Sequence, residues 1–282
     1  MRRRDLVKAI LAGAPAWMLA RAGAARAAAA SPQLRSAAAL VVDQDTGAVL
    51  FAKNPDTVQP IASITKLMTA IVTLEAQLDF DEVLEVDDSD RLATRGQSRM
   101  PVGTRLTRRE ALQVALMASE NRAARVLGRT YPGGLDAAIA AMNAKARQIG
   151  MRDSRFADPT GLSQQNRSTP ADLVRLVEAA YQHPEIREDS TASEMTIANG
   201  RRPLHFVNTN RLTRRADWDI GLQKTGYIAA AGRCLVMQAT VAKRRVVMVF
   251  LDSYGKYSRL GDANRIRAWL LAQAGVVPPR HS

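Results

Sequence analysis

Hydrophobic positions along the chain follow two different periods. Near both ends, apolar runs of strand-type composition alternate with short turn signals, whereas in the middle apolar residues recur at helical spacing. The predicted strands cover 37–53, as a hairpin around Asp45-Thr46-Gly47, and 232–241 and 245–253, as a second pair. The predicted helices cover 63–77, 107–118, 121–127, 135–149, a segment that starts at Thr169-Pro170, and about 262–274.

The order of these elements predicts the fold class. Strands from the two ends of the chain should meet in one antiparallel sheet, and the central helices should pack beside it as an α-rich lobe. The expected class is therefore α/β in the broad sense, or α+β. Because no linker separates the two halves, residues 28–282 are expected to form a single domain.

The first 27 residues have the composition of an export signal. They carry six basic residues against one acidic residue, and the apolar stretch from Ala9 to Ala20 is too short to span a bilayer. Ala25-Arg26-Ala27 is a small-x-small cleavage site, so we expect cleavage after Ala27. Arg3-Arg4 is compatible with twin-arginine export as well as with the general secretory route. We expect a periplasmic mature protein without a transmembrane segment.

Composition excludes several classes of site. The single cysteine, Cys234, allows no intrachain disulfide and lies in an apolar run, which indicates a core residue. The three histidines show no ligand spacing, so we expect no metal and no cofactor. The net charge of +13 favours an anionic partner, but aromatic residues make up only 5% and no nucleic-acid-binding motif is found. Anionic cell wall, lipid head groups or a merely solvated basic surface would each explain the charge.

Candidate chemistry begins at Ser63-Ile64-Thr65-Lys66, at the start of a predicted helix. Positions three apart share a helix face, so Lys66 can reach the Ser63 hydroxyl, which needs a base to become a nucleophile. Lysine serves as that base only if burial or a nearby cation lowers its pKa. The same spacing recurs at Ser253-Tyr254-Gly255-Lys256, which we predict to be a loop leaving a strand and not a site.

Two further motifs each occur once. Ser119-Glu120-Asn121 ends an apolar helix and offers a hydroxyl for proton relay and an amide for substrate backbone. Lys224-Thr225-Gly226 opens the strand-rich C-terminal part and could hold a carboxylate, with glycine allowing close backbone approach. Alone, each motif is explained as well by a helix end or a turn. Together, in the order S-x-x-K, S-x-N, K-T-G, they are the signature of penicillin-binding proteins and active-site serine β-lactamases.

The chain resembles the low-molecular-mass penicillin-binding proteins of the D-alanyl-D-alanine carboxypeptidase group. The similar segments are IASITKLMTA (61–70), ALMASENRAA (115–124), YPGG (131–134), AMNAKA (141–146), DPTGLS (158–163), KTGY (224–227) and GKY (255–257). The resemblance implies a serine β-lactamase-like fold in which an antiparallel sheet is flanked by helices. The resemblance also implies that residues 28–282 form a penicillin-binding, transpeptidase-like catalytic domain.

The resemblance implies a role for each motif residue. Ser63 would be the acylated nucleophile, Lys66 its proton acceptor, and Ser119 a proton shuttle to the leaving amine. The oxyanion hole would use the backbone N–H groups of Ser63 and Tyr227. The residues implied to bind substrate are Asn121, Lys224, Thr225, Gly226 and Tyr227. The implied partners are peptidoglycan peptide stems and, as covalent inhibitors, β-lactam antibiotics.

The implied activity is hydrolysis of D-alanyl cross-links in peptidoglycan. A terminal D-Ala and a cross-link to the D-centre of diaminopimelate both carry a carboxylate next to the scissile amide, so one clamp could serve both bonds. Few residues follow the third motif, too few for the extra β-domain and anchor helix of many relatives. This favours an endopeptidase over the alternative, a carboxypeptidase that removes terminal D-Ala.

Three rival classes fit the sequence less well. A class A β-lactamase would carry a Glu-x-x-x-Asn segment between the second and third motifs, where Asp158-Pro159-Thr160-Gly161-Leu162 stands instead. A Ser-His-Asp esterase would need a Gly-x-Ser-x-Gly elbow, which does not occur. A non-catalytic wall-binding protein would not need all the catalytic positions, and labelling with a fluorescent penicillin separates it from an enzyme.

Overall fold

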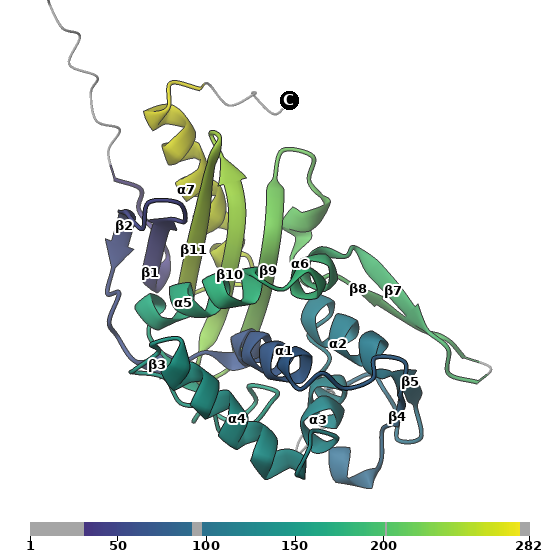
Figure 1. Ribbon diagram of the computed structural model, residues 1–282. Coiled ribbons are helices and arrows are strands. Elements are labelled where there is room, and N and C mark those ends of the chain that lie inside the picture. The colour runs from purple at the N-terminus through teal and green to yellow at the C-terminus, as the bar shows by residue number, and fades with distance from the viewer. Residues whose placement is uncertain (1–30, 92–97, 201, 277–282) are drawn as a thin grey trace, which may run out of the picture.

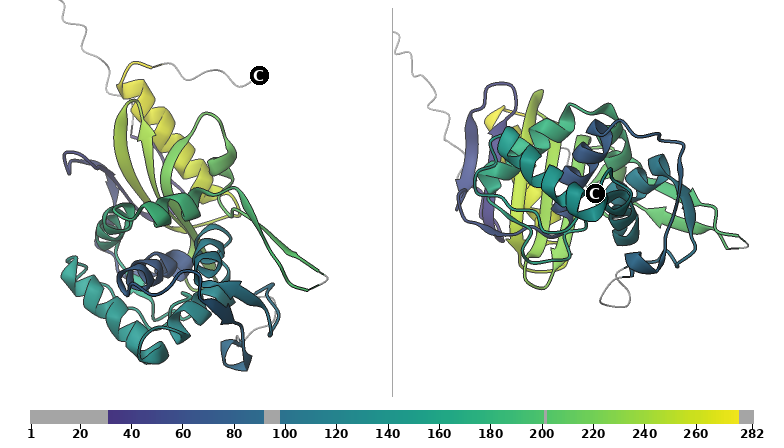
Figure 2. Two further views of the ribbon diagram at one scale, coloured as in Figure 1. Left: turned by 45° about the vertical axis from the view of Figure 1, so that its right-hand side comes forward. Right: turned by 60° about the horizontal axis from the view of Figure 1, so that its bottom comes forward.

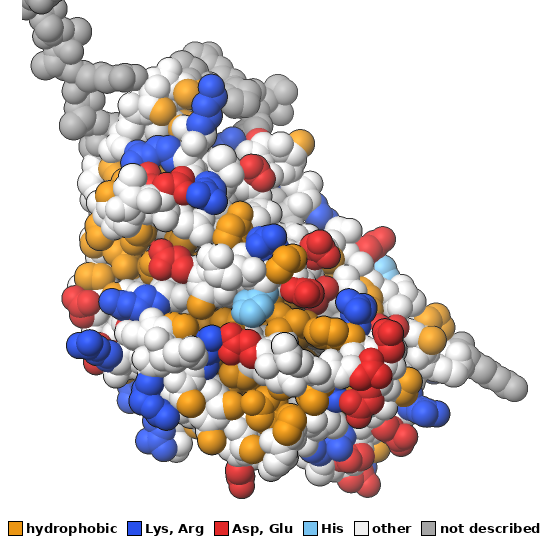
Figure 3. Space-filling view, in the orientation of Figure 1, with side chains coloured by type: hydrophobic (Ala, Val, Ile, Leu, Met, Phe, Trp, Pro, Cys, Tyr) orange, Lys and Arg blue, Asp and Glu red, His pale blue; other side chains and the backbone are white. Residues whose placement is uncertain are grey.

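The fold is built around one antiparallel sheet between two helical layers. The computed structural model describes residues 31–91, 98–200 and 202–276, so the predicted export signal at 1–27 lies outside the described residues. Figure 1 shows α1 (Thr65–Glu75) and α5 (Pro170–Tyr181) on the near side of the sheet and α7 (Ser258–Gln273) on the far side. Figure 2 shows α7 lying along that far face from a second direction. On the face in Figure 3, acidic and basic side chains are intermixed.

The sheet joins strands from the two ends of the chain. Its order is β2-β1-β11-β10-β9, and every neighbouring pair is antiparallel. The strands are β1 (Ser36–Asp43), β2 (Val49–Lys53), β9 (Asp219–Ile228), β10 (Gly232–Val241) and β11 (Arg244–Ser253). β1 pairs with β11 from Ser36 opposite Ser253 to Asp43 opposite Val246. The predicted meeting of the two ends of the chain, and both predicted hairpins, are therefore confirmed.

Both faces of the sheet are buried at its centre, which explains why β1, β10 and β11 are nearly continuous apolar runs. Along β1, Leu40 and Val42 belong to the core beneath the helical lobe, whereas Val41 belongs to the core beneath α7 (Ser258–Gln273). Cys234 is fully buried on the lobe side, and burial raises the pKa of its thiol to about 11. The prediction that Cys234 is a core residue is confirmed.

The helical lobe contains all the predicted helices except the last, which is α7. They are α1 (Thr65–Glu75), α2 (Arg108–Met117), α3 (Asn121–Arg129), α4 (Gly134–Gln148) and α5 (Pro170–Tyr181). The capping box predicted at the start of α2 is present, because the Thr107 side chain accepts from the Glu110 N–H and Glu110 accepts from the Thr107 N–H. α4 ends before Gly150, whose φ of +79° suits glycine. Within the described ranges, no helix is long and apolar enough to cross a membrane.

Several short elements do not follow from the sequence pattern. They are β3 (Gln59–Pro60), β4 (Val83–Glu85), β5 (Arg105–Thr107), β6 (Arg167–Ser168), α6 (Pro184–Thr191), β7 (Glu194–Ile197) and β8 (Leu204–Val207). α6 buries only Ile186 and Ser190, so it has no apolar stripe to detect. The β7–β8 hairpin projects from the body of the protein in Figure 1. α7 begins four residues before its predicted start, at Ser258.

Candidate active site

Ser63 lies in a short 3-10 turn (Ala62–Ile64) that leads directly into α1. Ala62 has a φ of +47°, a left-handed conformation that costs free energy for a residue with a Cβ and persists only where surrounding structure imposes it. Two glycines, Gly161 and Gly226, pack closely against this turn. A Cβ on Gly161 would lie 2.0 Å from the Ala62 carbonyl oxygen, and a Cβ on Gly226 would lie 3.1 Å from the Ser63 nitrogen. The third motif's glycine therefore lets β9 approach the serine backbone.

Lys66 is buried directly beneath Ser63. Its side chain is 1% exposed, and its Nζ lies 3.0 Å from the Ser63 Oγ. The same amine donates to the Asn121 Oδ1 at 2.7 Å and to the Thr160 carbonyl oxygen at 2.6 Å. The structure thus brings together Ser63 and Lys66 of the first motif and Asn121 of the second.

Burial shifts Lys66 toward its uncharged form. It lowers the pKa of Lys66 to about 7, although the negative charges of Asp158 and Glu120 act in the opposite direction. An uncharged amine keeps two hydrogens and one lone pair. Asn121 and Thr160 can accept the two hydrogens, which leaves the lone pair facing the Ser63 hydroxyl. This arrangement can remove a proton from Ser63 near neutral pH.

The loop at 158–163 supplies the carbonyl that holds Lys66. The Asp158 carboxylate accepts the backbone N–H groups of Thr160 at 2.6 Å, Gly161 at 2.8 Å and Ser163 at 2.9 Å. Burial would raise the pKa of Asp158, but a hydrogen bond from the Thr160 hydroxyl and these backbone hydrogen bonds together lower it, so the carboxylate stays charged. The family resemblance includes this segment but implies no role for it. In the structure, the segment positions Lys66.

The second motif connects α2 to α3. Ser119 is half-buried with a φ of +61°, and its hydroxyl makes no hydrogen bond within the part of the chain that the structure describes. Glu120 is buried and caps α3 by accepting the Arg122 N–H at 3.1 Å. This cap fixes the start of α3, and Asn121 is the first residue of that helix.

The third motif lies within β9 and not in a turn. Lys224 is fully buried, and its Nζ donates to the Thr225 carbonyl oxygen at 2.9 Å. Burial, followed by the charges of Lys66 and Arg259, holds the pKa of Lys224 well below its usual value. The Thr225 hydroxyl lies 2.6 Å from the Thr209 hydroxyl. An arriving carboxylate would favour the charged form of Lys224 again, because an opposite charge within a few ångströms raises a lysine pKa.

Arg259 is a site residue that the sequence reasoning missed. It lies in the first turn of α7 and donates from Nη1 to the Gly226 carbonyl oxygen at 2.7 Å. Burial and the nearby Arg233 lower its pKa to about 10. No acidic side chain among the described residues forms an ion pair with Lys66, Lys224 or Arg259. Without such a partner, burial and mutual repulsion lower the pKa values of these groups, and an anionic ligand would favour their charged forms again.

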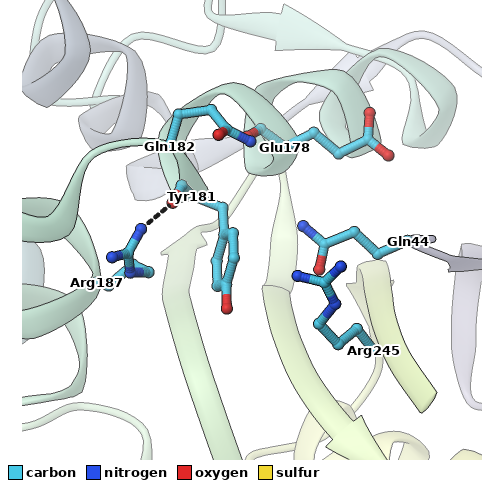
Figure 4. Close-up of a pocket in the computed structure, with 6 residues that line it drawn as sticks. All are labelled: Gln44, Glu178, Tyr181, Gln182, Arg187 and Arg245. Atoms are coloured by element: carbon cyan, nitrogen blue, oxygen red, sulfur yellow. Dashed lines mark hydrogen bonds between the residues drawn. The ribbon is translucent and has the colours of Figure 1, made fainter.

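A second hollow among the described residues lacks this combination. A hollow of about 430 Å³ between α5, α6 and β11 contains none of the motif residues (Figure 4). Its cations have partners, since Arg245 pairs with Asp45 and Arg187 donates to the Tyr181 carbonyl oxygen at 2.5 Å. We find no group of three metal-binding side chains in the described ranges.

The chain matches a known family along most of its length. The model of peptidase family S11, described as D-alanyl-D-alanine carboxypeptidase, matches residues 25–255. A D-alanyl-D-alanine endopeptidase of Pseudomonas aeruginosa is 49% identical over 251 residues, which are 87% of this chain and 81% of that protein. An Escherichia coli protein of the same name is 46% identical over 259 residues, which are 91% of this chain and 83% of that protein.

Solved structures agree with the fold. The Streptomyces K15 DD-transpeptidase has a TM-score of 0.79 and 25% identity, covering 86% of this chain and 99% of that one. Penicillin-binding protein D2 of Listeria monocytogenes, in its ampicillin-bound form, has a TM-score of 0.75 and 27% identity over 86% of this chain and 99% of that one. The expected penicillin-binding-protein fold is confirmed, and the chain belongs to peptidase family S11, the D-alanyl-D-alanine carboxypeptidase family.

Proposed function

We propose that this protein is a serine D,D-peptidase that hydrolyses D-alanyl cross-links in peptidoglycan through an acyl-enzyme on Ser63. The observation that carries the proposal is the 3.0 Å contact between the buried Lys66 amine and the Ser63 hydroxyl, in a chain of family S11. Its relatives of 46–49% identity are named D-alanyl-D-alanine endopeptidases.

Acylation follows from the positions of the motif residues. Uncharged Lys66 takes the proton of the Ser63 hydroxyl as Oγ attacks the carbonyl carbon of D-Ala. The backbone N–H groups of Ser63 and Tyr227 stabilise the oxyanion, and the close approach of β9 to the Ser63 nitrogen supports this pairing. The C–N bond then breaks, and the proton passes from Lys66 through Ser119 to the leaving amine.

Hydrolysis restores the enzyme. Lys66 removes a proton from water, the hydroxide attacks the ester carbonyl, and the C–Oγ bond breaks as Ser63 recovers a proton. Asn121 would hold the acyl chain while Lys224, Thr225 and Gly226 hold the carboxylate next to the scissile bond. Lys224 and Arg259 have no acidic partner among the described residues and their pKa values are lowered, so a carboxylate bound at this position would stabilise the charged forms of both.

The endopeptidase preference is tested with two substrates. A purified dimer joined through D-Ala and diaminopimelate and a monomeric pentapeptide are digested under identical conditions, and kcat/KM is measured for each. We expect the dimer to be cleaved at least as well as the pentapeptide. Cleavage of the pentapeptide alone would make the enzyme a carboxypeptidase, an activity also found in the names of its more distant relatives.

The compartment, the inhibitors and the partners of this enzyme can also be inferred. We infer export to the periplasm by the segment 1–27, with β-lactam antibiotics as covalent inhibitors and peptidoglycan stems as partners. The ampicillin-bound structure of a relative supports the inhibitor class. Intact-mass measurement of the periplasmic product should show loss of residues near 1–27, and a full-length cytoplasmic product would contradict export.

A further inference from the structure

Exposed aromatic side chains gather at one end of β9. Among the described residues, the aromatic side chains that are largely exposed are Tyr227, Tyr254 and Tyr257, at 55%, 88% and 50%. Tyr227 directly follows the K-T-G motif, and the other two lie between β11 and α7. Large exposed aromatic groups gathered at one place are typical of a binding surface.

Cations without carboxylate partners accompany these tyrosines. The Arg233 guanidinium lies 4.4 Å from the Tyr227 ring centroid, and Arg211 and Lys256 lie 5.4 and 5.5 Å from the Tyr257 ring centroid. None of the three forms an ion pair with an acidic side chain that the structure describes. The surface is therefore complementary to a negatively charged partner.

This surface continues directly from the active site. Arg233 is paired with Tyr227 across β9 and β10, one residue beyond Gly226. Tyr257 immediately precedes α7, and Arg259 in the first turn of that helix donates to the Gly226 carbonyl oxygen. A ligand whose carboxylate is held by Lys224 and Thr225 therefore meets these residues if it extends past the third motif.

The chemistry of the proposed reaction identifies what extends there. The carboxylate beside the scissile amide belongs to the leaving residue. In a terminal D-Ala the leaving group ends at that residue, but in a cross-link it continues through the diaminopimelate side chain into a second peptide stem. That stem carries further free carboxylates, which unpaired cations can bind.

Resting on the proposed function, we propose that six residues form a docking surface for the acidic second stem of a cross-linked substrate. The residues are Arg211, Tyr227, Arg233, Tyr254, Lys256 and Tyr257. They stabilise the leaving stem and so distinguish a cross-link from a terminal D-Ala. Because the contacts are electrostatic and lie at the surface, with Arg211 and Lys256 exposed and Arg233 half-buried, their contribution falls as ionic strength rises.

The test compares a dimer substrate with a ligand that has no second stem. In the variant Arg233→Gln/Lys256→Gln, kcat/KM for the purified cross-linked dimer should fall about tenfold, mainly through KM, while the rate of acylation by fluorescent penicillin stays unchanged. Lys243→Gln, in the turn between β10 and β11, is the matched control and should change neither rate. An unchanged dimer rate, or an equal fall in both rates, would overturn the docking surface.

A chemical arm tests the charges of the partner. The free carboxylates of the second stem are amidated, and only the one beside the scissile bond is left intact. The wild-type enzyme should then lose about the same tenfold, whereas the double variant should cleave the native and amidated dimers equally. Equal cleavage of both dimers by the wild type would overturn the proposal. A wild type that acylates with penicillin but leaves every dimer intact would instead refute the endopeptidase function on which it rests.

Discussion

The segments 63–66 and 253–256 have the same Ser-x-x-Lys spacing in different surroundings. Ser63 lies in a turn before a helix, and Lys66 is buried with its Nζ 3.0 Å from the serine oxygen. Ser253 ends β11, and its hydroxyl lies 2.5 Å from that of Ser36. Lys256 is exposed and lies over the Tyr257 ring. The second segment is the predicted loop leaving a strand, and only in the first segment does the lysine amine contact the serine hydroxyl among the hydrogen bonds of the described residues.

The difference shows what spacing contributes to this chemistry. On a helix, three residues bring the serine and the lysine to one face, whereas at the end of a strand they do not. Even on the helix, the lysine becomes a base only because burial lowers its pKa and because neighbouring acceptors direct its lone pair. Substitutions in the first segment should therefore remove activity, whereas substitutions in the second segment should leave activity intact and lower only the stability of the fold.

The largest expected effect is the loss of covalent labelling in Ser63→Ala. This variant has no hydroxyl to form the ester, so neither fluorescent penicillin labelling nor peptide cleavage should remain. Ser253→Ala, the matched variant, should keep both activities. Labelling of Ser63→Ala, read on a denaturing gel, would remove Ser63 from the mechanism.

Lys66→Ala should slow acylation itself and not only turnover. The base acts in the first proton transfer, so the acylation rate constant should fall on the order of a hundredfold or more. Stopped-flow measurement with a chromogenic β-lactam gives this constant directly. Lys256→Ala should acylate like the wild type, and an equal loss in both variants would indicate a general effect of removing a cation.

The pH profile of acylation should follow the depressed pKa of Lys66. Because the uncharged amine is the active form and its pKa is about 7, acylation should be fast above pH 7 and decline below it. From pH 8 to pH 5 the rate should fall roughly a hundredfold, as the uncharged fraction falls. Lys256→Ala should leave the profile in place. A rate that is flat between pH 5 and 8 would exclude Lys66 as the titrating base.

The sequence predicts the sheet and most helices because those elements bury their own side chains. The apolar runs of β1, β10 and β11 and the capping box at Thr107 and Glu110 are local signals, and the structure confirms them. The short hairpins and α6 have no such signal, since they are stabilised by tertiary contacts. The Gln223 side chain, for example, donates from β9 to the Ser190 carbonyl oxygen of α6 at 2.6 Å.

Two groups of the candidate site, the Thr160 carbonyl and Arg259, likewise have no signal in the sequence from which they could be predicted. The motifs identify Ser63, Lys66 and Asn121, which the structure brings together around one amine. The Thr160 carbonyl is a backbone group, and any residue there would supply one. Arg259 contacts Gly226 from a helix that begins 32 residues further along the chain, so no spacing rule connects them.

The smallest expected effects distinguish a structural serine from a catalytic one. Ser36 links the second Ser-x-x-Lys segment to α7, because its hydroxyl contacts Ser253 and donates to the buried Asp262 carboxylate at 2.6 Å. Ser36→Ala removes a hydrogen bond to a charged group, so the free energy of unfolding should fall by about 1.5–3 kcal/mol. Ser253→Ala should cost about 1 kcal/mol, and the double variant should cost less than the sum because the two hydroxyls share one contact.

The single variants Ser36→Ala and Ser253→Ala should both acylate normally. Ser63→Ala should lose acylation, with a smaller change in the free energy of unfolding than Ser36→Ala. Urea unfolding and penicillin labelling of the same preparations measure both quantities, and a Ser36→Ala variant that is as stable as the wild type would show that this network contributes nothing to the fold.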